Sequence, residues 1–246
     1  SQATLRELQI GFPIADYRSA YKAKPLSYLG NLVGHEGKGS LLSALKAEGL
    51  AEGLGAGSGI AWRGGSLFSL SVTLTEAGAT NFERVLQLVF AYMDMLRREG
   101  PKKWLYEEQA QLADLAFRFR SSPEPIHYVS ALVSGMHVYA PEDVLRGPSL
   151  MEEYKKAMFE DLMSALVPEN ALVTFSDKLA KTDQVSEYYQ VPYSAKTPDT
   201  AEIESWRNVA AIDSLRLPAP NDFIAEDVSL KAISSDNSAV PQVVLE

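Results

Sequence analysis

The sequence predicts an α+β fold in which a mixed, mainly antiparallel sheet packs against a layer of helices. Three observations lead to this prediction: a strand-like segment near the start, a hairpin of alternating apolar and polar residues after it, and a block of amphipathic helices before the last short strands. Strands and helices in separate runs are typical of α+β domains, whereas α/β domains alternate them regularly.

The first three strands of the expected sheet lie in the N-terminal third of the chain. Residues 8–14 alternate apolar with polar or small side chains, as a half-buried strand does. Residues 67–75 alternate in the same way, and the Arg-Gly-Gly-Ser sequence at 63–66 is typical of a tight turn. This turn predicts an antiparallel hairpin with residues 54–62, although the glycines of that segment weaken it as a strand.

Helices fill most of the remaining chain. A stripe of apolar residues at helical spacing predicts a long helix that ends at Gly100, and Thr80 with Glu83 forms a capping box at its expected start. A second capping box, Ser149 with Glu152, predicts a helix that runs to about residue 166. The other expected helices are residues 25–33, 40–48, 101–119, 125–138 and 201–211.

The end of the chain predicts two further strands and a linker. Residues 171–175 are apolar enough for a short strand, and residues 188–191 are expected to form another. After Leu217 the composition shifts toward Pro, Ala, Ser and Asp. We therefore predict one domain over residues 1–216 and a linker over residues 217–246 that leads toward a following domain.

The composition excludes several classes of function. The 246 residues carry a formal net charge of −9, so the basic surface that nucleic-acid binding needs is absent and nucleic acid is not an expected partner. The chain has no cysteine, which excludes disulfides and thiolate metal sites. It has no run of about 18 apolar residues, so no membrane span is expected.

The stretch LGNLVGHEGKGS at residues 29–40 combines a His-Glu pair with four glycines. A phosphate-binding loop needs Gly-Lys-Ser/Thr after its tight turn, but here Lys38 is followed by glycine. The inverse zinc motif His-x-x-Glu-His needs a histidine at Asn31 and a glutamate at Gly34, which leaves only His35 of the pattern. A lone histidine cannot hold a catalytic metal, so a packed or hydrogen-bonded structural role is expected for it.

Catalytic patterns of other kinds are also missing. The sequence has no Gly-x-Ser-x-Gly elbow, and its paired glutamates, such as Glu107 with Glu108, are typical of solvated helix faces. No catalytic residue and no metal ligand is predicted within this chain.

Several long stretches resemble one known family, the insulysin–pitrilysin zinc peptidases, and in particular its second domain. These stretches are YLGNLVGHEGKGSLLSALKAEGL, VTLTEAG and LRREGPKKWLYEEQAQLADLAFRF, followed in the same order by PSLMEEY and LVPEN. The resemblance covers nearly the whole chain and implies a family of four related domains that form two bowl-shaped halves around a chamber. It implies that Asn31, Gly34 and His35 are the remains of a metal motif. It also implies that zinc belongs to a catalytic domain outside this chain, which itself needs no cofactor.

The resemblance implies a substrate-binding role as well. In the family, a glycine-containing edge strand pairs its backbone with the amino-terminal end of an extended peptide. The matching positions are Leu54, Gly55, Ala56, Gly57 and Ser58 on the strand, and Ser27, Gly30, Gly34 and Glu36 before it. Ala56 stands where a glycine is expected, and Glu36 is expected to pair with the substrate α-amino group. The alternative is that the glycines only make turns and that Glu36 caps the helix near Ser40.

Three functions follow from these observations. The first is a non-catalytic middle domain of a zinc metalloendopeptidase, which forms part of the substrate chamber and anchors the peptide amino terminus. The second is a structural or interaction subunit of the same family without peptidase activity. An independent enzyme has only an analogy of fold behind it, and the chain alone is predicted to be inactive. The expected partners are a peptide substrate and the remaining domains of the same polypeptide. The expected location is the periplasm, with the cytoplasm as the alternative.

Overall fold

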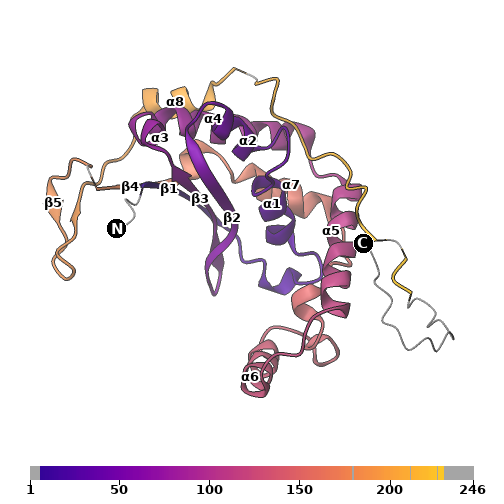
Figure 1. Cartoon of the computed structure of the whole chain (residues 1–246). Coiled ribbons are helices and arrows are strands. Elements are labelled where there is room, and N and C mark those ends of the chain that lie inside the picture. Colours follow the sequence, from indigo (N-terminus) through magenta and orange to yellow (C-terminus); the bar gives the residue numbers. More distant parts are fainter. Residues whose placement is uncertain (1–5, 179, 211, 226, 230–246) are drawn as a thin grey trace, which may run out of the picture.

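A four-stranded antiparallel sheet lies at the centre of the part that the computed structural model describes, residues 6–178, 180–210, 212–225 and 227–229. The strand order is β2-β3-β1-β4, so β2 and β4 are its two edges (Figure 1). The bounds are β1 Arg6–Ile14, β2 Ala51–Trp62, β3 Gly65–Leu74 and β4 Leu172–Asp177. All strand pairs of this sheet are antiparallel, and the predicted fold class is confirmed.

The alternation seen in the sequence places one face of the sheet in the core. On the two central strands, Leu8 pairs with Val72 and Phe12 pairs with Phe68, and all four side chains are fully buried. The residues between them, such as Gln9, point to the opposite face and are more exposed. A period of two along each strand therefore separates a helix-covered face from an open one.

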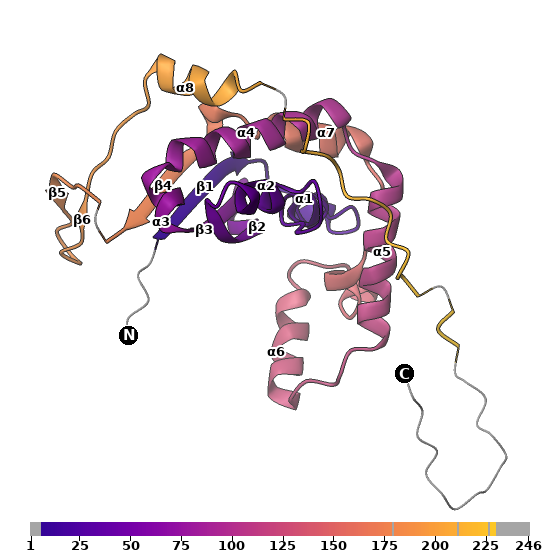
Figure 2. The same ribbon diagram turned by 45° about the horizontal axis from the view of Figure 1, so that its top comes forward.

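Helices cover the apolar face of the sheet. Helix α4 crosses it, as Figures 1 and 2 show, and the Phe90 ring of α4 meets the Phe12 ring of β1 edge to face at 6.3 Å. Burial of such aromatic and aliphatic side chains is the main stabilising contribution to a fold of this kind. The bounds of the helices of the main body are α1 Pro25–Val33, α2 Leu41–Ala47, α3 Glu76–Thr80, α4 Phe82–Glu99, α5 Lys103–Arg118, α7 Lys156–Ser164 and α8 Thr200–Arg207.

Two parts of the chain project from this body. Helix α6, Pro125–Gly135, hangs from the end of α5 in both views (Figures 1 and 2). A short hairpin of β5, Gln184–Val185, and β6, Pro192–Tyr193, extends at the other end of the molecule (Figure 2). Short 3-10 helices lie at Arg18–Ala20, Pro141–Asp143, Gly147–Ser149 and Pro168–Asn170.

The segment after α8 runs back along the body toward α5 (Figure 2). The Arg216 backbone N–H donates to the Gly39 carbonyl at 3.0 Å, and the Asn221 N–H donates to the Glu108 carboxylate at 3.0 Å. Residues 217–225 and 227–229 contain no helix or strand, and residues 226 and 230–246 of the predicted linker lie outside the described residues. The boundary at residue 216 stays a prediction.

Both predicted capping boxes are wrong. The carboxylate of Glu83 and the backbone N–H of Glu152 form hydrogen bonds with residues far away in the sequence instead. The long helix expected after Thr80 is found as α4, but it begins at Phe82 and its N-cap is Asn81. Thr80 is instead the last residue of a separate helix, α3, which Thr75 caps by accepting the Gly78 N–H at 3.0 Å. The Glu83 carboxylate accepts the indole N–H of Trp206 from α8 at 2.7 Å instead of closing a box. Likewise, the Glu152 N–H donates to the Lys22 carbonyl, and α7 begins only at Lys156.

The strand predicted at residues 188–191 is also wrong. These residues form the turn between β5 and β6, and Gln190 there has a φ of 53°. Tyrosine and valine favour strands, but their side chains find no core to pack against at this position, because Tyr188 and Tyr189 are 91% and 84% exposed. The other predicted strands are confirmed, and the remaining predicted helices are found with ends that differ by a few residues.

Candidate functional site

A groove of about 570 Å³ lies between helix α1 and the edge strand β2. Its lining residues come from two segments about twenty residues apart in sequence. They are Leu26, Ser27, Gly30, Asn31, Gly34 and His35 from α1 and its C-terminal end, and Leu54, Gly55, Ala56, Gly57 and Ser58 from β2.

Helix α1 presents this side because of its residue spacing. The groove residues recur every three or four positions, while Tyr28, Leu29, Leu32 and Val33 on the other side are buried in the core. Pro25 occupies the first helical position, where its missing N–H costs nothing. The apolar side of α1 therefore faces the core, and its small and polar side faces β2.

Gly30 lets α1 approach β2 closely, and Gly34 ends the helix beside the strand. A Cβ at Gly30 would lie 3.2 Å from both the carbonyl oxygen of Ala56 and the Cα of Gly57. Gly34 ends the helix by donating its N–H to the Gly30 carbonyl at 2.8 Å, and a Cβ there would lie 2.9 Å from that same oxygen. At Gly30 the backbone of the helix therefore lies against the backbone of the strand, with no side chain between them.

The edge strand offers its backbone to the groove. In the described part of the chain, β2 pairs with β3 on one side and has no strand on the other. The nitrogen of Ala56 lies 3.8 Å from the Cβ position of Gly34, and its oxygen lies near Gly30, so both atoms face α1. Edge-strand N–H and C=O groups of this kind are a ready template for another extended chain.

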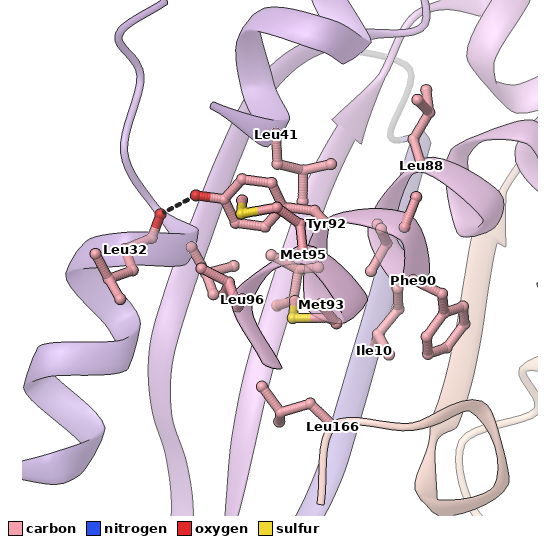
Figure 3. Packing of buried hydrophobic residues seen from close by; sticks show 14 of the residues in the cluster. Ile10, Leu32, Leu41, Leu88, Phe90, Tyr92, Met93, Met95, Leu96 and Leu166 are labelled. Atoms are coloured by element: carbon pink, nitrogen blue, oxygen red, sulfur yellow. Dashed lines mark hydrogen bonds between the residues drawn. The ribbon is translucent and has the colours of Figure 1, made fainter. Parts of the chain in front are cut away.

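Two buried tyrosines hold α1 in place. The Tyr92 hydroxyl of α4 donates to the Leu32 carbonyl at 2.8 Å, which satisfies one of the last carbonyls of the helix (Figure 3). The Tyr28 hydroxyl accepts the Lys102 N–H at 2.9 Å and donates to the carbonyl of the same residue at 3.3 Å. Burial raises the pKa of Tyr28 to about 12 and raises the pKa of Tyr92 further still.

The loop after α1 is closed by local hydrogen bonds. The Gly37 N–H donates to Nδ1 of His35 at 2.9 Å, and the Ser40 N–H donates to the Gly37 carbonyl at 3.0 Å. Ser40 is the N-cap of α2, because its hydroxyl oxygen accepts the Ser43 N–H at 3.1 Å. The cap of α2 is therefore Ser40 and not Glu36.

The structure brings together most of the site residues that the resemblance implied. Ser27, Gly30 and Gly34 line the same groove as the five strand residues 54–58. Glu36 is not in that lining; it is exposed, and within the described residues it has no hydrogen bond or ion pair. Leu26 lines the groove without having been predicted, and its position one helical turn before Gly30 is the signal that identifies it.

The residues of the degenerate motif do not fit a zinc ion. Asn31 and Gly34 supply neither imidazole nor carboxylate, and Nδ1 of His35 already accepts a backbone hydrogen bond. No group of three histidine, aspartate or glutamate side chains in the described part of the chain could hold a metal ion. Among the same residues, no helix has the length and apolar character needed to cross a membrane.

Comparisons with known proteins identify the class of this domain as a degenerate, peptidase-like one. Residues 2–112 match a family model described as the peptidase M16 inactive domain, and residues 117–246 match one described as the middle or third domain of peptidase M16. The chain belongs to the peptidase M16 family. The predicted resemblance to the insulysin–pitrilysin family is confirmed, and the matches are to domains of a zinc protease family that are not its catalytic one.

Individual relatives show the same relationship. The chain is 34% identical over 242 residues to human insulin-degrading enzyme and 32% identical over 244 residues to that of Drosophila melanogaster; both alignments cover 98% of the chain. A crystal structure of pitrilysin superimposes with a TM-score of 0.87 and 25% identity over 92% of the chain. The chain spans only 24–25% of the length of these proteins.

Proposed function

We propose that this chain is a non-catalytic part of a zinc metalloendopeptidase and that its groove holds the amino-terminal segment of a peptide substrate along β2. The domain would then form part of the wall of the substrate chamber. Zinc and the catalytic groups would belong to another domain of the parent polypeptide. A periplasmic location stays a prediction.

The observation that carries this proposal is the outward-facing backbone of Ala56 beside a helix kept close by Gly30. An extended peptide that enters the groove can form main-chain hydrogen bonds with the edge of β2, largely regardless of its own side chains. The glycines of β2 add no side chains that would block such a backbone. The groove is therefore suited to a peptide of varied sequence in an extended conformation.

Glu36 is the proposed partner of the substrate α-amino group. It follows the groove-lining His35 directly, and its carboxylate is free of hydrogen bonds and ion pairs within the described residues. The competing role as a helix cap is taken by Ser40. A carboxylate and an ammonium group form a charge-assisted hydrogen bond, which would favour peptides with a free amino terminus.

Isothermal titration calorimetry with one peptide and its N-acetylated twin tests this function. We expect the free peptide to bind about tenfold more tightly, because one exposed charge-assisted hydrogen bond is lost on acetylation. The Glu36→Gln variant should remove this preference, and Glu124→Gln, an exposed glutamate near α6, should leave it unchanged. Equal affinities would remove Glu36 from its role, and no binding of either peptide would contradict the groove as a substrate site.

A second function, an interaction subunit without peptidase activity, is favoured by the surface of α6. Ile126, Val129 and Val133 on α6 and Met136 directly after it are each more than half exposed. Clustered exposed apolar residues on a projecting helix are typical of a surface that another protein covers. Sedimentation analysis of the purified chain with a catalytic chain of the same family tests this alternative: a stable complex that Ile126→Ser plus Met136→Ser dissociates would support it.

A further inference from the structure

His35 is the only ionisable side chain in the lining of the groove within the part of the chain that the structure describes. It is half-buried and follows Gly34, the residue that ends α1. The remaining lining is made of aliphatic side chains, glycines, two serines and one asparagine. Among these small groups, the imidazole is the largest polar side chain that a bound peptide can contact.

The geometry of the loop determines which ring nitrogen carries the proton. The Gly37 N–H donates to Nδ1 of His35 at 2.9 Å, so Nδ1 acts as the acceptor. In a neutral imidazole the proton then sits on Nε2, which becomes a donor. A Cβ at Gly37 would overlap the imidazole at Cε1, so the ring lies directly against the Gly37 backbone.

The loop that carries His35 is itself held from two sides. The Ser40 N–H donates to the Gly37 carbonyl, and the Arg216 N–H of the segment after α8 donates to the Gly39 carbonyl, both at 3.0 Å. The orientation of the ring is therefore set before any ligand arrives. A preorganised donor loses little conformational entropy when it binds.

Nε2 of His35 has no hydrogen-bond partner among the described residues. We propose that His35 is a peptide-binding residue of the groove, whose Nε2–H donates a hydrogen bond to a main-chain carbonyl of the bound peptide. The proposal rests on the proposed function of the groove. It differs from the role of Glu36, because a carbonyl acceptor is present whether or not the peptide amino terminus is acetylated.

Two substitutions separate this role from a purely structural one. In His35→Asn, the amide oxygen occupies the position of Nδ1 and can still accept the Gly37 N–H, but no donor reaches the position of Nε2. In His35→Gln, the longer side chain places a donor near the position of Nε2 and gives up the bond to Gly37. We expect His35→Asn to weaken binding of free and acetylated peptides alike by about fivefold, the equivalent of one neutral hydrogen bond. His35→Gln should retain most of the affinity.

A structural role predicts the opposite order, with His35→Asn harmless and His35→Gln harmful. The His127→Asn variant, an exposed histidine of α6, is the matched control and should bind as the unchanged chain does. Nitrogen NMR of the imidazole should show the Nε2–H form, with a signal that shifts when peptide is added. Full affinity of His35→Asn, or an unmoved Nε2 signal at saturation, would overturn the role of His35 alone. Failure of the unchanged chain to bind either peptide would overturn the groove and His35 together.

Discussion

The two edges of the central sheet are built differently. Strand β2 has twelve residues rich in glycine, and α1 lies beside it with backbone close to backbone. Strand β4 has six residues and no glycine, and its Phe175 stacks on Phe82 at 4.9 Å between ring centroids. Both strands pair on one side only within the described residues.

The contrast shows that the groove beside β2 depends on more than an unpaired strand edge. Large side chains at β4 pack the strand onto the helix layer, whereas small residues at β2 leave room beside the backbone. The groove also depends on α1, which two buried tyrosine hydroxyls hold in position. Changes at α1 should therefore alter peptide binding at the β2 edge. Loss of apolar packing at the β4 edge should instead lower the stability of the fold.

Alkaline pH should disturb the β2 edge most. Burial raises the pKa of Tyr28 to about 12 from an ordinary value of 10.0, so the fold favours the neutral phenol. The stabilisation is fully present below the unfolded pKa and is lost as the pH rises from about 10 through about 12. Peptide binding should disappear in the same window in which tyrosinate absorbance appears. Binding that survives ionisation of the buried tyrosines would contradict this anchoring role.

The Phe175→Ala variant should be the most destabilising single change at the β4 edge. It removes a half-buried ring that stacks on Phe82, and we expect a loss of about 2–3 kcal/mol in the free energy of unfolding. Leu172→Ala, at a side chain that is 63% exposed on the same strand, should change that free energy by less than about 0.5 kcal/mol. Urea unfolding measures both. Peptide affinity should stay unchanged in both variants, since neither residue lines the groove.

The Tyr92→Phe variant should cost about 1–2 kcal/mol of stability, because it leaves the buried Leu32 carbonyl without its donor. Tyr188→Phe removes a hydroxyl from a side chain that is 91% exposed and serves as the control. Chemical denaturation compares the two. Equal stability of both variants would show that this hydrogen bond does not hold α1.

The Gly30→Ala variant should change stability little but binding clearly. Alanine favours the helix by about 1 kcal/mol, while its Cβ, 3.2 Å from the Ala56 oxygen, pushes α1 away from β2. We expect the two effects nearly to cancel in the free energy of unfolding and peptide affinity to fall about tenfold, since the groove is reshaped. Gly11→Ala on β1, where the nearest atom is 3.9 Å away, should leave affinity unchanged. Titration calorimetry measures the peptide affinity of both variants, and equal affinities would contradict a role of the Gly30 contact in shaping the groove.

Much of the fold could be predicted because its signals are local. Alternation along residues 8–14 and 67–75 identifies the two central strands, and the Arg63-Gly64 turn identifies the hairpin. The capping boxes failed where a distant group competed, as the Trp206 indole does for Glu83. The Lys22 carbonyl accepts the Glu152 N–H in the same way. Residue spacing in the sequence does not show that Trp206 lies near Glu83 or that Lys22 lies near Glu152.

The site was only partly predictable. Resemblance to known sequences indicated the groove positions of α1 and β2, and helical spacing alone would have added Leu26. The path of the loop at Gly37 decides two features of the site. It keeps Glu36 out of the groove lining, and it makes Nδ1 of His35 a hydrogen-bond acceptor. That path follows from hydrogen bonds within the loop and from the Arg216 contact, which joins residues far apart in the chain.

The sequence by itself determined the strand pattern and showed that residues 31–35 lack the His-x-x-Glu-His motif, because Asn31 and Gly34 are neither histidine nor glutamate. Only the tertiary structure decided that Gly30 meets Ala56 and that a groove results. Backbone preference and side-chain alternation act over a few neighbouring residues. The contact between α1 and β2 exists only after Tyr28, Leu29 and their neighbours are buried in a core that residues from the whole chain build.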